Sequence, residues 1–224
     1  MCLLGFSKRG DQITRQSLRI GFENNGDGAG FAYAKDGELI VKKGFFSFNS
    51  FYEAYKESIG YPTIVHFRAA SQGVVNAENC HPYSINNNLC IAHNGCIFNP
   101  KFKDIEKSDT RMLTENILTP IFNICPDLIK SNYFEKLFCS VIHTGKFIFL
   151  DNKDNYLIIG EDLGHWNNDI WWSNYSYEES MFGWIKGKTK NLFGLNAHNN
   201  FMEGKKLMRN QLMDSDEYYN QFMT

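Results

Sequence analysis

The sequence predicts an α+β fold with largely antiparallel sheets, and three observations lead to this prediction. Strand-like and helix-like segments follow one another without the strict strand–helix–strand alternation of parallel sheets. Two pairs of apolar segments are separated by short polar turns, as in antiparallel hairpins. The chain has 224 residues, 43% of them hydrophobic, so it can bury the core of one large domain.

The two hairpins are predicted from their turns. Asp36-Gly37 separates the first pair of apolar segments, and Asp-Gly is a strong signal for a tight hairpin turn. Asn152-Lys153-Asp154-Asn155 separates the second pair. The predicted strand pairs are residues 30–34 with 39–43, and residues 147–150 with 156–159.

The remaining elements follow from local patterns. Ser108 is a helix N-cap residue, and Pro120 is expected to stop the helix that begins there. Tyr61-Pro62 ends an earlier helix before a strand. The sequence thus predicts single strands over residues 1–6, 63–67 and 89–92, and helices over residues 51–59, 109–118 and 133–142.

The composition changes near residue 180. Strand patterning ends there, and Lys, Asn, Gly and Met become frequent before an acidic, aromatic end. We therefore expect one domain over residues 1–180 and a peripheral or partly ordered C-terminal extension over residues 181–224. A docking element for a partner is the alternative interpretation of this extension.

Charge and hydropathy exclude several classes of protein. The net charge of −2 shows no basic excess, so no nucleic-acid partner is expected. No apolar run is long enough for a transmembrane helix, and charged residues interrupt the start before a signal peptide can form. We expect a cytoplasmic protein whose six cysteines stay reduced. The five cysteines after Cys2 are interpreted as mostly buried or incidental.

Cys2 is the first candidate for chemistry. Removal of Met1 would give Cys2 both a thiol and a free α-amine, whose ordinary pKa of about 7.7–8.0 suits a general base. The alternative is a structural one, because Cys2-Leu3-Leu4-Gly5-Phe6 also fits a core strand.

Three further side chains suit the binding of an amino acid. Arg68, after a predicted strand, can hold a carboxylate, and Asp109, at a helix start, can bind an ammonium. Asn94-Gly95 can aim an amide and a backbone N–H at one point, as an oxyanion hole requires. Each also has a plain structural interpretation, as a surface charge, a helix cap or a turn.

The order of the motifs resembles the class II glutamine amidotransferases, a family of N-terminal nucleophile hydrolases. Met1-Cys2 is followed by a His-x-Arg-x-Ala-Ser segment, an Asn-x-His-Pro segment, a His-Asn-Gly segment and Ser-Asp-Thr. These motifs occupy residues 1–2, 66–71, 79–82, 93–95 and 108–110.

The resemblance implies a fold, a reaction and a set of roles. The fold is a four-layer αββα sandwich with two antiparallel sheets. The reaction is hydrolysis of the glutamine side-chain amide through a γ-glutamyl thioester, without a cofactor or metal. Cys2 would be the nucleophile, Asn94 and Gly95 the oxyanion donors, and Arg68, Ser71 and Asp109 the substrate-binding residues.

The sequence departs from the family pattern at two positions. Leu3 stands where many members have glycine, and Ala69 stands where several synthase-linked members have an aromatic residue that closes the ammonia channel. The pattern is closer to a stand-alone branch of the family, some of whose members hydrolyse γ-glutamyl peptides. Delivery of ammonia to a separate acceptor protein is the other expectation, and the oligomeric state is left open.

The sequence leaves two alternative functions open that are not amide hydrolysis. One is a zinc site, suggested by Cys80, His81, Cys90, His93 and Cys96, although no Cys-x-x-Cys pair is present. The other is a catalytically inactive domain that binds a partner or a γ-glutamyl ligand.

Overall fold

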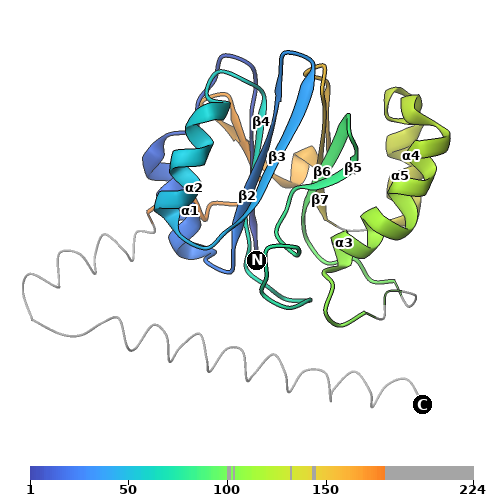
Figure 1. Cartoon of the computed structure of the whole chain (residues 1–224), viewed down its shortest axis with the longest axis horizontal. Helices are drawn as coiled ribbons and strands as arrows, with labels where there is room; N and C mark the ends of the chain where they lie inside the picture. The colour runs from blue at the N-terminus through green and yellow to red at the C-terminus, as the bar shows by residue number, and fades with distance from the viewer. Residues whose placement is uncertain (100–101, 103, 132, 143–144, 180–224) are drawn as a thin grey trace, which may run out of the picture. The chain divides into compact units, whose positions relative to one another are not determined.

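Two antiparallel sheets form the centre of the structure, which is a computed structural model (Figure 1). It describes residues 1–99, 102, 104–131, 133–142 and 145–179. The predicted extension over residues 181–224 lies outside the described residues. Every strand pair in the described part of the chain is antiparallel, which confirms the predicted sheet type.

The first sheet has six strands in the order β3-β2-β4-β1-β10-β9. Its central strand β1 is buried on both faces. β1 runs antiparallel to both β4 and β10, so the start of β1 lies beside the ends of these two strands. The strands are β1 (Leu3–Ser7), β2 (Ala29–Lys35), β3 (Glu38–Phe45), β4 (Thr63–Phe67), β9 (His165–Asn167) and β10 (Ile170–Trp172).

The second sheet has four strands in the order β5-β6-β7-β8. Its strand β6 ends in Asn94, one of the candidate residues, which pairs with Lys146. The strands are β5 (Tyr83–Asn86), β6 (Leu89–Asn94), β7 (Lys146–Asp151) and β8 (Tyr156–Ile159).

Helices cover both outer faces of the sheets, which gives four layers (Figure 1). α1 (Arg15–Asn24) and α2 (Phe48–Tyr55) lie against the first sheet, and α3 (Asp109–Leu113), α4 (Thr119–Ile124) and α5 (Phe134–Val141) lie against the second. The connecting turns are the 3₁₀ segments Lys56–Ser58, Pro126–Lys130 and Glu161–Leu163 and the π-helical segment Thr114–Leu118.

Three apolar clusters correspond to the three interfaces between these layers. The outer clusters are rich in aromatic rings, such as Phe31 of β2 with Phe51 of α2, and Phe149 of β7 with Phe122 of α4. The cluster between the sheets combines aliphatic side chains of both sheets, such as Leu4 of β1 and Ile148 of β7, with the rings of Phe6 and Trp171. Burial of large rings and aliphatic groups at about 25 cal/mol per Å² supplies most of the stabilisation of such layers.

The predicted hairpins are confirmed. Asp36 and Gly37 have φ angles of +51° and +86°, as a tight two-residue turn between β2 and β3 requires. β7 and β8 pair around the second predicted turn. The predicted strands over residues 63–67 and 156–159 coincide with β4 and β8.

The prediction that Pro120 ends a helix is wrong. The chain passes from α3 through the π-helical segment into α4, and Pro120 lies in the first turn of α4. Proline is tolerated there because the first N–H groups of a helix need no partner within the helix.

Among the described residues, five α-helices and strands have no counterpart in the sequence-based prediction, namely α1, α4, β5, β9 and β10. The strands have three or four residues, too few for a periodic pattern. α1 did have a local signal, because Thr14 is its N-cap and accepts a hydrogen bond from the Ser17 N–H at 3.1 Å.

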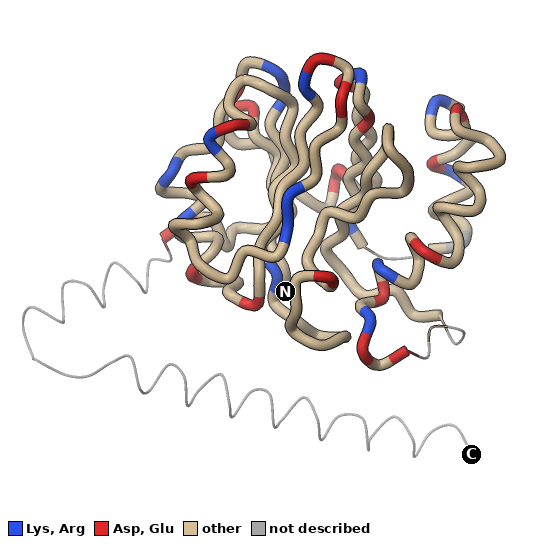
Figure 2. The backbone as a smooth tube through the Cα atoms, in the orientation of Figure 1, with Lys and Arg blue, Asp and Glu red and all other residues tan. Residues whose placement is uncertain are grey.

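Charged residues of both signs are interspersed along the chain (Figure 2). Within the described residues, no helix is both long and apolar enough to cross a membrane. Of the five cysteines after Cys2, Cys80 and Cys90 are buried, whereas Cys96, Cys125 and Cys139 are exposed, so burial is confirmed for two of the five.

Candidate active site

Cys2 lies beside the end of β4 because of the strand register. Leu3 pairs with Phe67, so the residue before Leu3 meets the residues that follow Phe67. The Ala69 N–H donates to the Cys2 sulfur at 3.4 Å, and the sulfur lies 3.5 Å from the Ala69 carbonyl oxygen. The Cys2 side chain is half-buried, whereas Met1 is 88% exposed. The fold therefore places the sulfur inside the site and leaves Met1 at the surface.

The surroundings of Cys2 favour the protonated thiol. Burial raises the pKa of the Cys2 thiol above its ordinary value, and the negative charge of Asp109 acts in the same direction. The Ala69 N–H and the positive charge of Arg68 oppose this rise. Since the thiol is protonated at neutral pH, attack by the sulfur requires a base.

Arg68 is buried, with only 2% of its surface exposed. Its guanidinium donates to the carbonyl oxygens of Val74 at 2.9 Å and Gln72 at 2.8 Å, and to that of Gly73 at 3.2 Å. Arg68 thus holds the loop that follows it. These three bonds occupy three of the five N–H donors of the guanidinium, and the binding of a substrate carboxylate by Arg68 stays a prediction.

Asp109 begins α3 and is 8% exposed. One carboxylate oxygen accepts from the Ile97 N–H at 2.7 Å, and the other accepts from the N–H of Thr110 at 2.7 Å. Burial raises the pKa of Asp109, and these hydrogen bonds together with the charge of Arg68 oppose the rise. The structure therefore brings Cys2, Arg68 and Asp109 within electrostatic reach of one another.

Asn94 is the last residue of β6, and Gly95 follows it. Asn94 is buried, and its side-chain amide donates to the Ser173 hydroxyl at 2.8 Å. A side chain at Gly95 would place its Cβ 2.7 Å from the His93 Nε2 and 2.8 Å from the Gly145 Cα, so only glycine fits there. The Ser173 hydroxyl that accepts from Asn94 also accepts from the Leu4 N–H at 2.9 Å, so Asn94 is linked to the strand that follows Cys2.

Ser71 is exposed on the loop that Arg68 holds, and its hydroxyl lies 4.0 Å from the Cys96 sulfur. It lines a shallow depression of about 580 Å³ together with Gln72, Gly73, Phe102, Asp104 and Ile105. Ser71 is thus at the rim of the site, apart from the buried charges.

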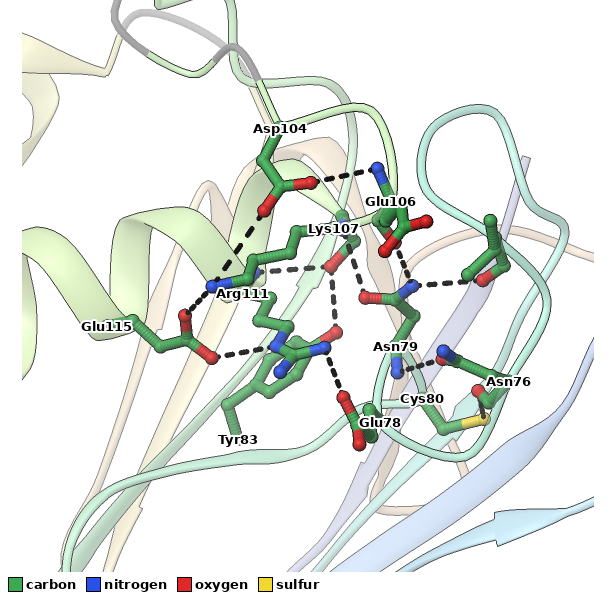
Figure 3. A network of polar contacts seen from close by, with 12 residues as sticks. Asn76, Glu78, Asn79, Cys80, Tyr83, Asp104, Glu106, Lys107, Arg111 and Glu115 are labelled. Atoms are coloured by element: carbon green, nitrogen blue, oxygen red, sulfur yellow. Dashed lines mark hydrogen bonds and ion pairs between the residues drawn. The ribbon is translucent and has the colours of Figure 1, made fainter.

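Asn79 joins this loop to the segment that carries Asp109 (Figure 3). Its amide donates to the carbonyl oxygens of Val74 at 3.0 Å and Glu106 at 2.6 Å, and its carbonyl accepts from the Ser108 N–H at 3.0 Å. Asn79 is fully buried, and all three bonds are satisfied. It fixes the Arg68 loop against the start of α3.

Ion pairs surround this buried connection (Figure 3). Arg111 pairs with Glu78 and Glu115 at 2.7 Å, and Lys107 pairs with Glu115 at 2.8 Å. The acidic partners are largely exposed, and such pairs contribute about 0–1 kcal/mol each. The buried bonds of Asn79 therefore dominate the connection.

Three buried histidines lie under the site. The rings of His66 and His81 have centroids 4.1 Å apart, and His93 stacks on Phe147 at 4.2 Å. Burial lowers the pKa values of His66 and His93 to about 3, and it lowers the pKa of His81 well below its ordinary value. All three are therefore neutral near pH 7 and serve as packed parts of the core.

The residues of the zinc alternative are not gathered around one point. Cys90 belongs to the cluster between the sheets, whereas Cys96 is exposed at the rim. In the described part of the chain, no three His, Cys, Asp or Glu side chains are arranged to hold a metal ion.

Ser173 and Asn174 contact the site but were missed by the sequence analysis. They follow β10, a three-residue strand without a periodic pattern, and they lie about 170 residues from Cys2 along the chain. Only the pairing of β10 with β1 brings them to the site.

The chain was compared with known proteins. No family model matches it, and a search of curated proteins gives no match. Solved structures that match include glutamine phosphoribosylpyrophosphate amidotransferase from B. subtilis, at 18% identity and a TM-score of 0.48. Another, described as the allosteric regulatory enzyme of purine biosynthesis, has 20% identity and a TM-score of 0.46.

A third matching structure is a glutamine aminotransferase class-II domain protein from Silicibacter pomeroyi, at 15% identity and a TM-score of 0.31. This match covers 68% of the present chain and 73% of that protein. The first two matches each cover 77% of this chain and 41% of the matched chain. The present chain thus spans less than half the length of these two enzymes, and its function is argued from its own site.

Proposed function

We propose that this protein hydrolyses the side-chain amide of glutamine, as a member of the class II, N-terminal nucleophile amidotransferases. The observation that carries the proposal is the electrostatic neighbourhood of the Cys2 sulfur. A buried cation, Arg68, and a buried carboxylate, Asp109, both act on this sulfur. An α-amino acid with a carboxylate and an ammonium complements this pair of charges.

In the first half of the proposed reaction, the Cys2 sulfur attacks the side-chain carbonyl carbon of glutamine. The thiol proton passes to the α-amine of Cys2 after Met1 has been removed, and from there to the leaving nitrogen. The carbonyl oxygen becomes an oxyanion, which the Asn94 amide and the Gly95 N–H would stabilise. Ammonia leaves, and a γ-glutamyl thioester to Cys2 remains.

In the second half, water replaces ammonia. The same α-amine removes a proton from the water as its oxygen attacks the thioester carbonyl. The carbon–sulfur bond breaks, the sulfur regains its proton, and glutamate leaves. Both halves use the same oxyanion donors.

The acceptor of the ammonia is the finer part of the proposal. Two candidates remain. In the first, the substrate is glutamine and the ammonia is delivered to a separate acceptor protein. In the second, the substrate is a γ-glutamyl peptide, and an amino compound leaves in place of ammonia. For the second candidate, the leaving amino compound would extend from the Cys2 sulfur toward the exposed rim, where Ser71 lines an open depression.

A substrate comparison tests the function. We expect protein that has lost Met1 to release equimolar glutamate and ammonia from L-glutamine, because the buried charge pair matches a free amino acid. The measurement is coupled detection of both products, with L-asparagine as the matched control, whose chain is one methylene shorter. Preferential release of amines from γ-glutamyl peptides would favour the peptidase. Binding without turnover of either substrate would favour an inactive module.

Asp109→Asn tests the recognition of the substrate amine. The substitution keeps the size of the side chain and removes the charge, but it also replaces one of the two oxygens that accept the Ile97 and Thr110 N–H groups by an NH₂ group. We expect KM for glutamine to rise at least about tenfold. For glutaric acid monoamide, which lacks the α-amine, kcat/KM should fall only by the smaller amount that the lost backbone bond causes. Equal losses on both substrates would show that Asp109 only supports the local structure.

A further inference from the structure

The two residues after β10 contact both halves of the proposed catalytic machinery. The Ser173 hydroxyl accepts hydrogen bonds from the Leu4 N–H at 2.9 Å and from the Asn94 amide at 2.8 Å. The Asn174 amide donates to the Cys2 carbonyl oxygen at 2.8 Å. The nucleophile strand is in one sheet and Asn94 is in the other, so Ser173 links the two sheets at the site.

We propose that Ser173 and Asn174 are positioning residues, Ser173 for the oxyanion donor Asn94 and Asn174 for the nucleophile Cys2. This inference rests on the proposed amide hydrolysis. Neither residue belongs to the motifs that predicted the site.

Ser173 fixes the direction of the Asn94 amide. An amide NH₂ group has two hydrogens, and the bond to Ser173 uses one of them, which sets the direction of the other. The hydroxyl itself is held by the Leu4 N–H, two residues from the nucleophile. Ser173 thereby fixes the oxyanion donor relative to the strand that carries the sulfur, and an oxyanion donor acts only when it is aimed correctly.

Asn174 fixes the backbone of Cys2, which lies next to the start of the chain. Pairing of β1 with β4 begins at Leu3, so Cys2 lies outside the ladder, and chain ends without such bonds are mobile. The bond from Asn174 holds the Cys2 carbonyl group, and it thereby restricts rotation about the bond between the Cys2 Cα and that carbonyl. Both the sulfur and the α-amine branch from this Cα.

The segment around these residues is itself fixed. The Ser173 N–H donates to the Leu4 carbonyl at 2.9 Å, which continues the pairing beyond β10. Trp172 stacks on Tyr177 with centroids 4.3 Å apart, and the Ser176 N–H donates to the side-chain Oδ1 of Asn174 at 2.9 Å. Such a well-anchored segment can transmit position to the site.

A double-mutant cycle tests Ser173. In protein without Met1, Ser173→Ala should lower kcat for glutamine about tenfold and leave KM within about twofold, because only the transition-state donor is misaligned. In an Asn94→Ala background the same change should have an effect below about twofold. Ser173→Thr, which keeps the hydroxyl, should restore most of kcat. Equal losses in both backgrounds would overturn the role of Ser173 and leave the proposed function intact.

Asn174→Asp tests the other contact. Aspartate can still accept from the Ser176 N–H but cannot donate to the Cys2 carbonyl. We expect labelling of Cys2 by a diazoketone analogue of glutamine to slow about tenfold. The control is Asn24→Asp, which removes a similar bond to the Ser176 carbonyl on the exposed surface and should leave the rate unchanged.

Three outcomes of this labelling experiment are informative. An unchanged rate in Asn174→Asp with folding retained, measured by circular dichroism, would overturn the role of Asn174. Equal slowing in Asn24→Asp would assign the effect to the segment as a whole, and would also overturn it. A wild-type protein that neither hydrolyses glutamine nor reacts with the analogue would instead overturn the proposed function, and this inference with it.

Discussion

Cys2→Ala is expected to abolish glutamine hydrolysis, with a fall in kcat of at least about 10⁴-fold. The proposed reaction has no path without the sulfur, because the thioester carries the γ-glutamyl group between its two halves. The fold should persist, since alanine fills most of the half-buried space and the bond from Asn174 goes to the backbone carbonyl. Product release and a thermal melt measure the two effects separately.

The control for this variant is Cys96→Ala. Cys96 is exposed at the rim of the site and follows Gly95, so its loss should change kcat by less than about threefold. The glutamine analogue should label Cys2 first, and intact mass should show that the labelled protein lacks Met1. Labelling of Cys96 or Cys80, or full activity with Met1 retained, would contradict the assigned nucleophile and base.

Acid is expected to unfold the protein between pH 6.5 and 3. The pKa values of His66 and His93 are about 3 in the folded state because burial disfavours the charged rings, whereas an exposed histidine has a pKa of about 6.5. As the pH falls below 6.5, these histidines bind protons in the unfolded chain but stay neutral in the folded chain. The stability present above pH 6.5 is therefore lost progressively toward pH 3.

The size of this effect rivals the whole stability of a domain. At about 1.36 kcal/mol per pKa unit, each of these two histidines costs about 5 kcal/mol by pH 3. His81 adds to this, since burial and the neighbouring His66 lower its pKa as well. Domains are stable by about 5–15 kcal/mol, so the native state should not survive to pH 3.

Urea unfolding at half-unit steps from pH 7 to pH 4 measures the acid effect. The free energy of unfolding should fall slowly near pH 7 and by about 3 kcal/mol per pH unit below about pH 5.5, where two histidines of the unfolded chain have each taken up nearly one proton. In His93→Gln the slope should be shallower by about one proton, whereas in His165→Gln, which lies at a partly exposed position, it should change little. A free energy of unfolding that is constant from pH 7 to pH 4 would refute the buried neutral histidines.

The sheet type and most of the elements could be predicted from the sequence because their signals are local. Asp36-Gly37 specifies a turn by the φ angles that these two residues tolerate, and Ser108 specifies a helix start by its side-chain oxygen, which accepts from the Arg111 N–H at 3.2 Å. Pro120 misled the prediction because a helix with a different hydrogen-bonding pattern precedes it.

For the candidate site, the sequence indicated which residues to consider. Cys2, Arg68, Asn94 and Asp109 belong to short motifs that could be recognised in order, and the structure places the sulfur, the cation and the carboxylate within electrostatic reach. Their roles in glutamine hydrolysis stay predictions. Ser71 was predicted to bind substrate, and its exposed position at the rim leaves that role to experiment.

By itself, the sequence determined the local elements and the residue types that the chemistry needs. Tertiary structure alone decided which distant residues act on them, since strand register is a property of pairs of strands. The pairing of β10 with β1 brings Ser173 and Asn174 to Asn94 and Cys2. No pattern within β10 encodes that contact, because a three-residue strand is stabilised by its neighbours and its position is set by them.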